Sequence, residues 1–195
     1  MNALWCATSN PGKLREFHAA LEGWFEVRTM PGLERIPVAP ETGVTFEENA
    51  AEKALYYAAH APGAVFVDDS GLAVDALDGA PGVYSARFAG PEATDDENNR
   101  LVLERMRGIE NRTARFVCVI ALAEGDQVIH IFRGEVEGRL LEQPRGRNGF
   151  GYDPLFFYPP FGRSFGEVPL AEKMKVSHRS RALAALRDWL LKNRA

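Results

Sequence analysis

Four short segments of this sequence carry side chains that could bind a phosphate, a divalent cation or an aromatic base. The first segment consists of Ser9, Asn10, Pro11, Gly12 and Lys13. If a helix starts here, its N–H groups and the positive end of its dipole attract anions, and Lys13 adds a mobile cation. Lysine is electrostatically unfavourable in a first helical turn unless an anion compensates it. The segment therefore predicts a phosphate-binding turn, although an ordinary helix cap followed by a solvated lysine explains the same residues.

The second segment is an acidic pair, Asp68 and Asp69, which directly follows the apolar run 64–67. Two adjacent carboxylates repel each other unless a cation or a proton lies between them. Hard oxygen ligands in small number, shared with substrate phosphates, are what Mg²⁺ usually takes, and Glu41 and Glu48 are further candidates. The pair predicts a metal site at an exposed strand end. A solvated turn is the alternative.

The third segment is the glycine-rich loop 148–154, in which Gly149 and Gly151 flank Phe150. An accessible ring there could stack on a nucleobase for about 1–3 kcal/mol. A tight turn with the ring in the core is the alternative.

The fourth segment is a cationic cluster at a predicted helix start, where positive charge is unfavourable without an anionic partner. Its members are Lys173, Lys175, Ser177, His178 and Arg179. A solvated basic turn is the alternative.

These segments lie where predicted helices and strands begin or end. Helices are expected after the capping residues Asn10, Thr45, Thr94 and Ser177, and Glu48 and Glu97 complete capping boxes at the second and third of these. Strands are expected at 4–7, 64–67, 114–123 and, as one or two strands, 127–141, with a hairpin at Gly125. The segment 143–165 is expected to be a long functional loop. The pattern indicates one mixed α/β domain covering residues 1–195.

Composition excludes several classes of protein. The 195 residues are 46% hydrophobic and include 23 basic and 27 acidic side chains, a net charge of −4 that argues against a nucleic-acid binder. The longest apolar run, 116–123, is far shorter than the ~20 residues of a membrane span, and Met1–Asn10 lacks a secretory signal pattern, so we expect a cytoplasmic protein. Cys6 and Cys118 are expected to be buried reduced thiols. The absence of HExxH removes the usual support for a metalloprotease function.

Taken together, the segments resemble the Ham1 family of pyrophosphatases that act on non-standard purine nucleoside triphosphates. The resemblance runs in order through ATSNPGKLREF, ETGVTFEENA, DDSGLAVDAL with GAPGVYSARFAG, GFGYDPLF and SHR, and it covers nearly the whole chain. It implies an α/β fold with a long mixed twisted sheet flanked by helices, and two lobes with a nucleotide cleft between them. It also implies Mg²⁺ dependence and a homodimer.

The resemblance further implies roles for particular residues. Thr8–Lys13 would bind the triphosphate, Glu41 and Asp69 would hold the metal, and Asp69 would be the general base. The other implied substrate contacts are Ser70, Phe150, Gly151, Tyr152, Asp153, Lys173, His178 and Arg179. Phe150 is expected against the base, and Lys173 is chosen over Lys175 by its four-residue spacing to Ser177. The sequence leaves open how Asp68 and Asp69 divide the roles of base and metal ligand.

The implied reaction is attack of water on the α-phosphorus, giving a nucleoside monophosphate and pyrophosphate. The substrates would be the triphosphates of inosine, deoxyinosine and xanthosine, removed so that they do not enter DNA or RNA. Three alternatives remain: a pyrophosphatase of another modified nucleotide, a non-catalytic nucleotide sensor, and an α/β interaction module. The last leaves Lys13, Asp68, Asp69 and Arg179 without a purpose. No residue pattern here explains how guanine would be excluded.

Overall fold

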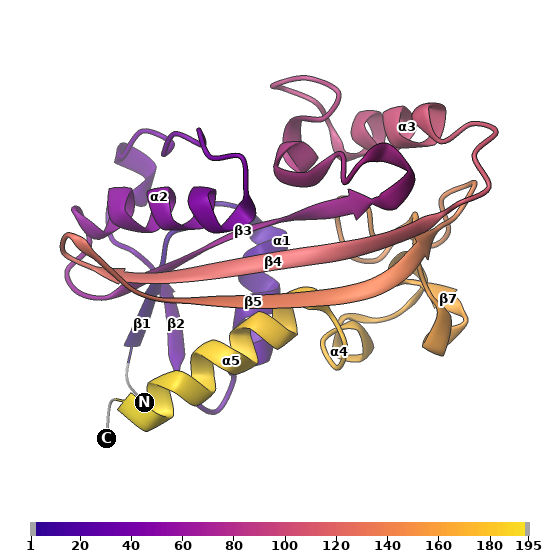
Figure 1. Ribbon diagram of the computed structural model, residues 1–195. Helices are drawn as coiled ribbons and strands as arrows, with labels where there is room; N and C mark the ends of the chain where they lie inside the picture. The colour runs from indigo at the N-terminus through magenta and orange to yellow at the C-terminus, as the bar shows by residue number, and fades with distance from the viewer. Residues whose placement is uncertain (1–2, 194–195) are drawn as a thin grey trace. The chain divides into compact units, whose positions relative to one another are not determined.

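The computed structural model describes residues 3–193, which form seven strands and five α-helices joined by short 3₁₀ segments (Figure 1). The strands are β1 (Ala3–Cys6), β2 (Glu26–Thr29), β3 (Val65–Val74), β4 (Thr113–Glu124), β5 (Gln127–Leu140), β6 (Phe156–Tyr158) and β7 (Arg163–Ser164). The helices are α1 (Pro11–Leu21), α2 (Phe46–Ala58), α3 (Asp95–Arg105), α4 (Leu170–Lys173) and α5 (His178–Asn193).

The strands form one mixed sheet in the order β2-β1-β3-β4-β5-β6-β7. β1 pairs in parallel with β2 and β3, whereas β6 pairs antiparallel with β5 and β7. A two-residue turn joins β4 to β5, and its first residue, Gly125, has a φ of 60°. Glycine adopts this left-handed conformation without a steric penalty, which confirms the predicted hairpin. The expected α/β fold, a mixed sheet flanked by helices, is also confirmed.

Local capping signals predicted the helix starts correctly. Asn10 caps α1, and reciprocal capping boxes at Thr45 and Thr94 begin α2 and α3. In each box the threonine hydroxyl accepts from the backbone N–H three residues later, and the glutamate there accepts from the threonine N–H. α5 begins directly after Ser177. These starts were predictable because each cap involves only neighbouring residues.

Several predicted boundaries are wrong. β3 continues to Val74, so Asp68 and Asp69 lie inside a strand, where they are 4% and 6% exposed, and not at an exposed strand end. The segment 143–165 is not one long loop, because it contains β6 and β7. Lys173 ends a short helix instead of beginning one, and it is 2% exposed.

The chain forms two compact units that are each discontinuous in sequence. Unit 1 comprises the residues up to Asp69, Cys118–Gly134 and the residues from His178 onward. Unit 2 comprises Ser70–Val117 and Glu135–Ser177. β3, β4 and β5 pass from one unit to the other. The single domain and its nucleotide cleft stay predictions.

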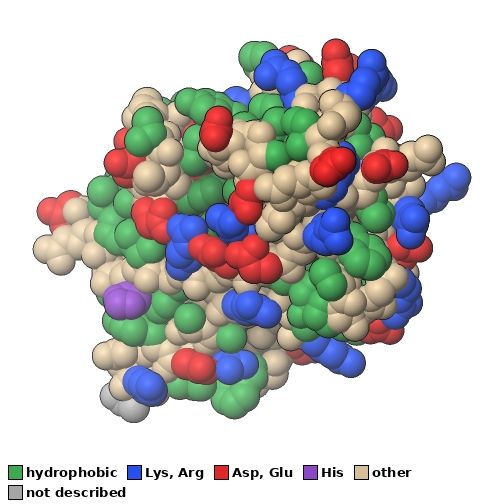
Figure 2. All heavy atoms as spheres, turned by 45° about the vertical axis from the view of Figure 1, so that its right-hand side comes forward, with side chains coloured by type: hydrophobic (Ala, Val, Ile, Leu, Met, Phe, Trp, Pro, Cys, Tyr) green, Lys and Arg blue, Asp and Glu red, His purple; other side chains and the backbone are tan. Residues whose placement is uncertain are grey.

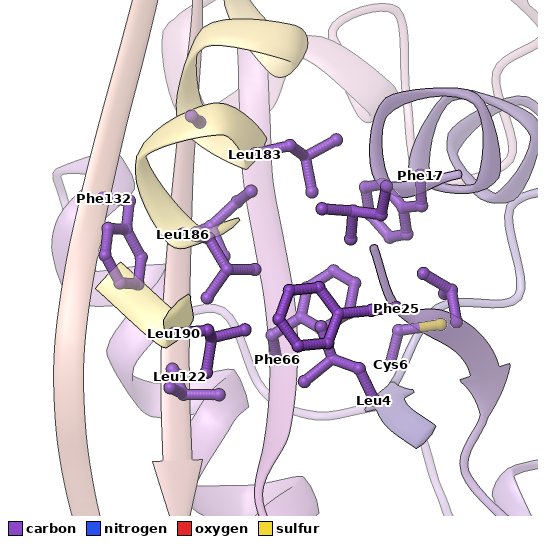
Figure 3. Packing of buried hydrophobic residues seen from close by; sticks show 14 of the residues in the cluster. Leu4, Cys6, Phe17, Phe25, Phe66, Leu122, Phe132, Leu183, Leu186 and Leu190 are labelled. Atoms are coloured by element: carbon purple, nitrogen blue, oxygen red, sulfur yellow. The ribbon is translucent and has the colours of Figure 1, made fainter. Parts of the chain in front are cut away.

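The core of unit 1 packs α1 and α5 against the strands (Figure 3). Phe17 and Leu21 lie one turn apart on α1, and α5 contributes leucines 183, 186 and 190 at helical spacing. Leu4 and Cys6 alternate with more exposed neighbours on β1, as expected for one face of a strand. Cys6 and Cys118 are buried free thiols, which confirms that prediction, and burial raises the pKa of each to about 12.

Gly134 on β5 lets α5 approach the sheet closely. A Cβ at this position would lie 2.2 Å from the His178 carbonyl oxygen and 2.6 Å from the Ala182 nitrogen, and both are backbone atoms that cannot turn aside. Gly134→Ala should therefore lower the free energy of unfolding by about 1–3 kcal/mol, the usual effect of overpacking. Urea denaturation measures this.

The matched control is Gly63→Ala, also in unit 1. Its added Cβ would meet only Glu124 Oε1, at an ordinary 3.8 Å. This control should change stability by less than about 0.5 kcal/mol. Equal denaturation midpoints for the two variants would show that α5 adjusts to a methyl group at Gly134.

Unit 2 has its own core, formed by α3 and the strands beside it, with Leu72, Val102, Phe116 and Phe156 among its buried members. On the face in Figure 2, acidic and basic side chains are interspersed and do not form a single continuous basic area. Among residues 3–193, no helix has the length and apolar character needed to cross a membrane.

Candidate active site

The Thr8–Lys13 turn follows β1 and begins α1. The Asn10 side chain accepts from the N–H groups of Gly12 (2.8 Å) and Lys13 (3.1 Å). The prediction that these two N–H groups are available to a phosphate is therefore wrong while this cap is intact. The helix dipole and the Lys13 ammonium, whose side chain is 19% exposed, remain as the attractive elements for an anion.

Asp68 and Asp69 point to opposite faces of β3, because successive side chains of a strand alternate. Asp68 shares its face with Phe66, which packs in the core with α1 and α5. Asp69 is turned toward Lys53, on α2. Each carboxylate pairs with a lysine from a different helix, Asp68 with Lys13 of α1 and Asp69 with Lys53 of α2.

Asp68 anchors a buried ion-pair network. Its Oδ1 lies 3.0 Å from Lys13 Nζ, and its Oδ2 accepts from Arg179 Nε (3.3 Å) and Nη2 (3.2 Å). Arg179 Nη1 donates to Glu16, which is 1% exposed. Burial disfavours the Asp68 carboxylate, but Lys13 and Arg179 outweigh it and hold its pKa well below the usual range. Asp68 is thus a fixed anion that positions Lys13.

Arg179 itself lies inside this network. Each of its three side-chain nitrogens is within hydrogen-bond distance of Glu16 or Asp68. Burial disfavours its charge, yet these two carboxylates raise its pKa further. The family resemblance implied that Arg179 contacts the substrate, whereas its observed contacts connect α1, β3 and α5. His178, at the start of α5, is 3% exposed.

Asp69 and Glu41 meet at the ammonium of Lys53. Lys53 Nζ donates to Asp69 Oδ1 at 2.6 Å and to Glu41 Oε1 at 3.0 Å. Burial raises the pKa of Asp69, although Lys53 opposes this. Burial disfavours the charge of Lys53, but Asp69 and Glu41 outweigh it and raise the pKa of Lys53. Two carboxylates far apart in sequence therefore converge on one cation.

The loop that carries Glu41 is fastened to one side of α2. Glu52 accepts from the Thr42 N–H (3.1 Å), and Asn49 accepts from the Gly43 N–H (2.9 Å). Glu48 accepts from the Val44 N–H at 2.8 Å. A Cβ at position 43 would lie 2.5 Å from Glu48 Cβ, so glycine is needed for this close approach. α2 thus supplies Lys53 and also holds the residues that follow Glu41.

The two carboxylates fit a magnesium ion. Residues 3–193 contain no group of three or more His, Cys, Asp or Glu side chains that could hold a metal. Magnesium often takes only one or two protein carboxylates and completes its shell with water and phosphate oxygens. Glu41 and Asp69 already share the ammonium group of Lys53. The Oδ2 atom of Asp69 is buried and has no hydrogen-bond partner within the described part of the chain. This oxygen suits a further ligand.

In unit 2, Phe150, Asp153 and Lys173 come together. Asp153 Oδ2 accepts from Lys173 Nζ at 2.5 Å and from the Phe150 N–H at 3.0 Å, and both charged residues are almost fully buried. The Phe150 ring is half-buried, with Lys173 Nζ 5.1 Å from its centroid. The Tyr152 hydroxyl donates to the Ser85 carbonyl at 2.8 Å. Ser70, half-buried on β3, begins unit 2.

Sequence reasoning missed Glu16 and Lys53. Glu16 lies three residues after Lys13, a spacing that puts both on one helix face, so a local signal existed. Lys53 contacts residues 12 and 16 positions away. No local pattern marks such contacts, because α2 was predicted only from its cap and its apolar residues.

The chain is similar to known proteins over nearly its whole length. The chain is 52% identical to a dITP/XTP pyrophosphatase of Exiguobacterium sp. over 92% of each chain. It is 48% identical to a dITP/XTP pyrophosphatase of Geobacter sulfurreducens over 97% of each. A solved HAM1 protein from Coxiella burnetii matches with a TM-score of 0.88 and 41% identity, covering 98% of this chain and 100% of that one. The Ham1 family model matches residues 4–189, and the chain belongs to this family.

Proposed function

We propose that this protein hydrolyses the triphosphates of inosine, deoxyinosine and xanthosine to the monophosphate and pyrophosphate. The observation that carries the proposal is the meeting of Glu41 and Asp69 at Lys53, on a chain about half identical to proteins named dITP/XTP pyrophosphatases. Such an enzyme removes non-standard purines before they enter DNA or RNA. Mg²⁺ dependence and a homodimer belong to the proposal through the family resemblance. A cytoplasmic location belongs to it because the sequence shows neither a secretory signal pattern nor an apolar run long enough for a membrane span.

In the proposed reaction a water oxygen forms a bond to the α-phosphorus, and the bond from that phosphorus to the bridging pyrophosphate oxygen breaks. Asp69 accepts the proton of the attacking water. Lys13 stabilises the negative charge that develops on the departing pyrophosphate. Mg²⁺ bound by Glu41 and Asp69 would neutralise charge on the phosphate oxygens.

The residues around Asp68 and Asp69 suit the two aspartates to different roles. Asp68 is surrounded by Lys13 and Arg179, so it serves to hold Lys13 in place. Asp69 has a buried oxygen without a hydrogen-bond partner in the range 3–193, which leaves it a place for the water or the metal. Lys53 keeps Asp69 and Glu41 together by attracting both. These contacts support Asp69 as the general base.

Base selectivity is proposed to depend on the 6-oxo group of hypoxanthine and xanthine. A site built to donate a hydrogen bond to this oxygen leaves its donor unpaired when adenine presents an amino group. The Phe150 ring would lie against the base, where stacking is worth about 1–3 kcal/mol and favours no particular base. Stacking therefore supplies affinity, and hydrogen bonds supply the selection.

The test is a panel of triphosphates assayed for pyrophosphate release with Mg²⁺ and with a chelator. Inosine triphosphate should yield inosine monophosphate and pyrophosphate at least about tenfold faster than ATP or GTP, since a site built for one polar pattern rejects another by such factors or more. Release of orthophosphate, or equal rates for inosine and guanosine triphosphates, would contradict the proposal. Tight binding without turnover would indicate a nucleotide sensor.

A further inference from the structure

Two side chains on one face of α3 hydrogen-bond to the backbone N–H and carbonyl of Gly151, in the loop 150–153. The Gly151 N–H donates to Asp95 Oδ2 at 2.6 Å, and the Gly151 carbonyl accepts from Asn99 Nδ2 at 3.0 Å. Asp95 and Asn99 are four residues apart, which places them on the same side of the helix. All three residues belong to unit 2. The loop is therefore fastened to α3 at the residue next to Phe150.

Gly151 has a backbone conformation that other residues rarely adopt. Its φ of 60° lies in the left-handed region, which glycine enters without the steric cost of a Cβ. No atom lies within 4 Å of where its Cβ would stand, so glycine is needed here for the backbone and not for space. The two hydrogen bonds from α3 select one orientation of a backbone that could otherwise adopt several.

Phe150 is fixed on its other side by Asp153. The Asp153 carboxylate accepts from the Phe150 N–H and from the buried Lys173, and the Lys173 ammonium lies 5.1 Å from the centroid of the Phe150 ring. The backbone of Phe150 thus lies between two attachments, one on α3 and one on Asp153. The α3 attachment was not visible in the sequence, because Asp95 and Gly151 are far apart along the chain.

The residue types on α3 suit a positioning role. The Thr94–Glu97 capping box already caps the helix, so Asp95 is not needed for that purpose. Asn99 is 6% exposed, and its Oδ1 has no hydrogen-bond partner among residues 3–193. A buried amide is unfavourable unless hydrogen bonds compensate it, and an apolar residue would pack at this position without that cost. The bond to Gly151 is a reason for an asparagine here.

We propose that Asp95 and Asn99 are positioning residues for base recognition, which hold Phe150 where it stacks on the purine. The inference rests on the proposed function and adds a specificity element to it. It concerns the base alone, since neither residue takes part in the proposed chemistry at the phosphate. Loss of the attachment should weaken the contribution of the base to binding and leave the reaction at the phosphate intact.

The experiment compares inosine triphosphate with ribose 5′-triphosphate, which has the same phosphates and no base. Asp95→Ala should raise KM for inosine triphosphate about tenfold, the scale of a lost hydrogen bond to a charged group, with kcat nearly unchanged. The kcat/KM for ribose 5′-triphosphate should stay within about twofold. Asn99→Ala should act in the same direction. Asp95→Asn, which keeps an oxygen acceptor, should restore most of the affinity.

The matched control is Asp96→Ala, which removes the same charge from the same exposed helical turn. It should leave KM for both substrates unchanged. Equal losses for both substrates in Asp95→Ala, or equal effects of Asp95→Ala and Asp96→Ala, would overturn the inference by showing a merely structural or electrostatic role.

Calorimetric binding of inosine triphosphate separates this inference from the proposed function. If the wild type binds the nucleotide without hydrolysing it, the proposed hydrolysis fails, and about tenfold weaker binding by Asp95→Ala still supports the attachment. Unchanged binding by that variant overturns it. If the wild type neither binds nor hydrolyses the nucleotide, the inference fails together with the function.

Discussion

Asp69→Asn is expected to reduce turnover of inosine triphosphate at least about a hundredfold, the lower range for loss of a general base. Asparagine keeps the shape of the side chain and an oxygen for Lys53, but it cannot accept the proton of the attacking water. It also removes a charged oxygen from the proposed metal site beside Glu41. Steady-state release of pyrophosphate at saturating substrate and Mg²⁺ measures the loss.

Two measurements separate this effect from a loss of structure. The urea midpoint of Asp69→Asn should stay high enough for the variant to be folded under assay conditions, and equilibrium binding of the nucleotide should change much less than turnover. The control is Asp75→Asn, whose half-exposed carboxylate pairs with Arg115 at 2.7 Å in unit 2. Near-normal turnover by folded Asp69→Asn would remove Asp69 from the mechanism.

The helix starts could be predicted from local capping residues, whereas the extent of β3 depends on contacts between residues far apart in the sequence. Asn10, Thr45 and Thr94 each cap with partners two or three residues away, so their neighbours were enough to predict them. The sequence predicted the end of β3 too early, because Asp-Asp-Ser-Gly is typical of a turn. The strand continues through both aspartates because helices far along the chain supply Lys13 and Arg179 on one face and Lys53 on the other.

The candidate site was predicted in part for the same reason. The convergence of Glu41 and Asp69 was expected from the family resemblance, and the structure brings both to Lys53. The availability of the Gly12 and Lys13 N–H groups was predicted wrongly because Asn10, chosen as the cap, uses them itself. A cap and an anion compete for the same donors, and the sequence alone does not decide which prevails.

The second large expected effect concerns the buried pair of Glu16 and Arg179. Glu16→Ala should lower the free energy of unfolding by about 3–5 kcal/mol, because it leaves the Arg179 charge buried without this carboxylate. Both side chains are 2% exposed, and Arg179 stays protonated since Glu16 and Asp68 raise its pKa. Urea denaturation at constant m-value measures the change.

A matched arginine–glutamate pair lies on the surface of the same unit. Arg133 and Glu47 approach to 2.5 Å, but their side chains are 44% and 39% exposed, so Glu47→Ala should cost no more than about 1 kcal/mol. Replacing Glu16 and Arg179 together by methionine should recover part of the loss, because no buried charge then lacks its partner, although Asp68 would depend more on Lys13. Equal effects of Glu16→Ala and Glu47→Ala would show that water or movement of α5 relieves the buried charge. In that case β3 and α1, and not Arg179, would hold Asp68 and Lys13 in position.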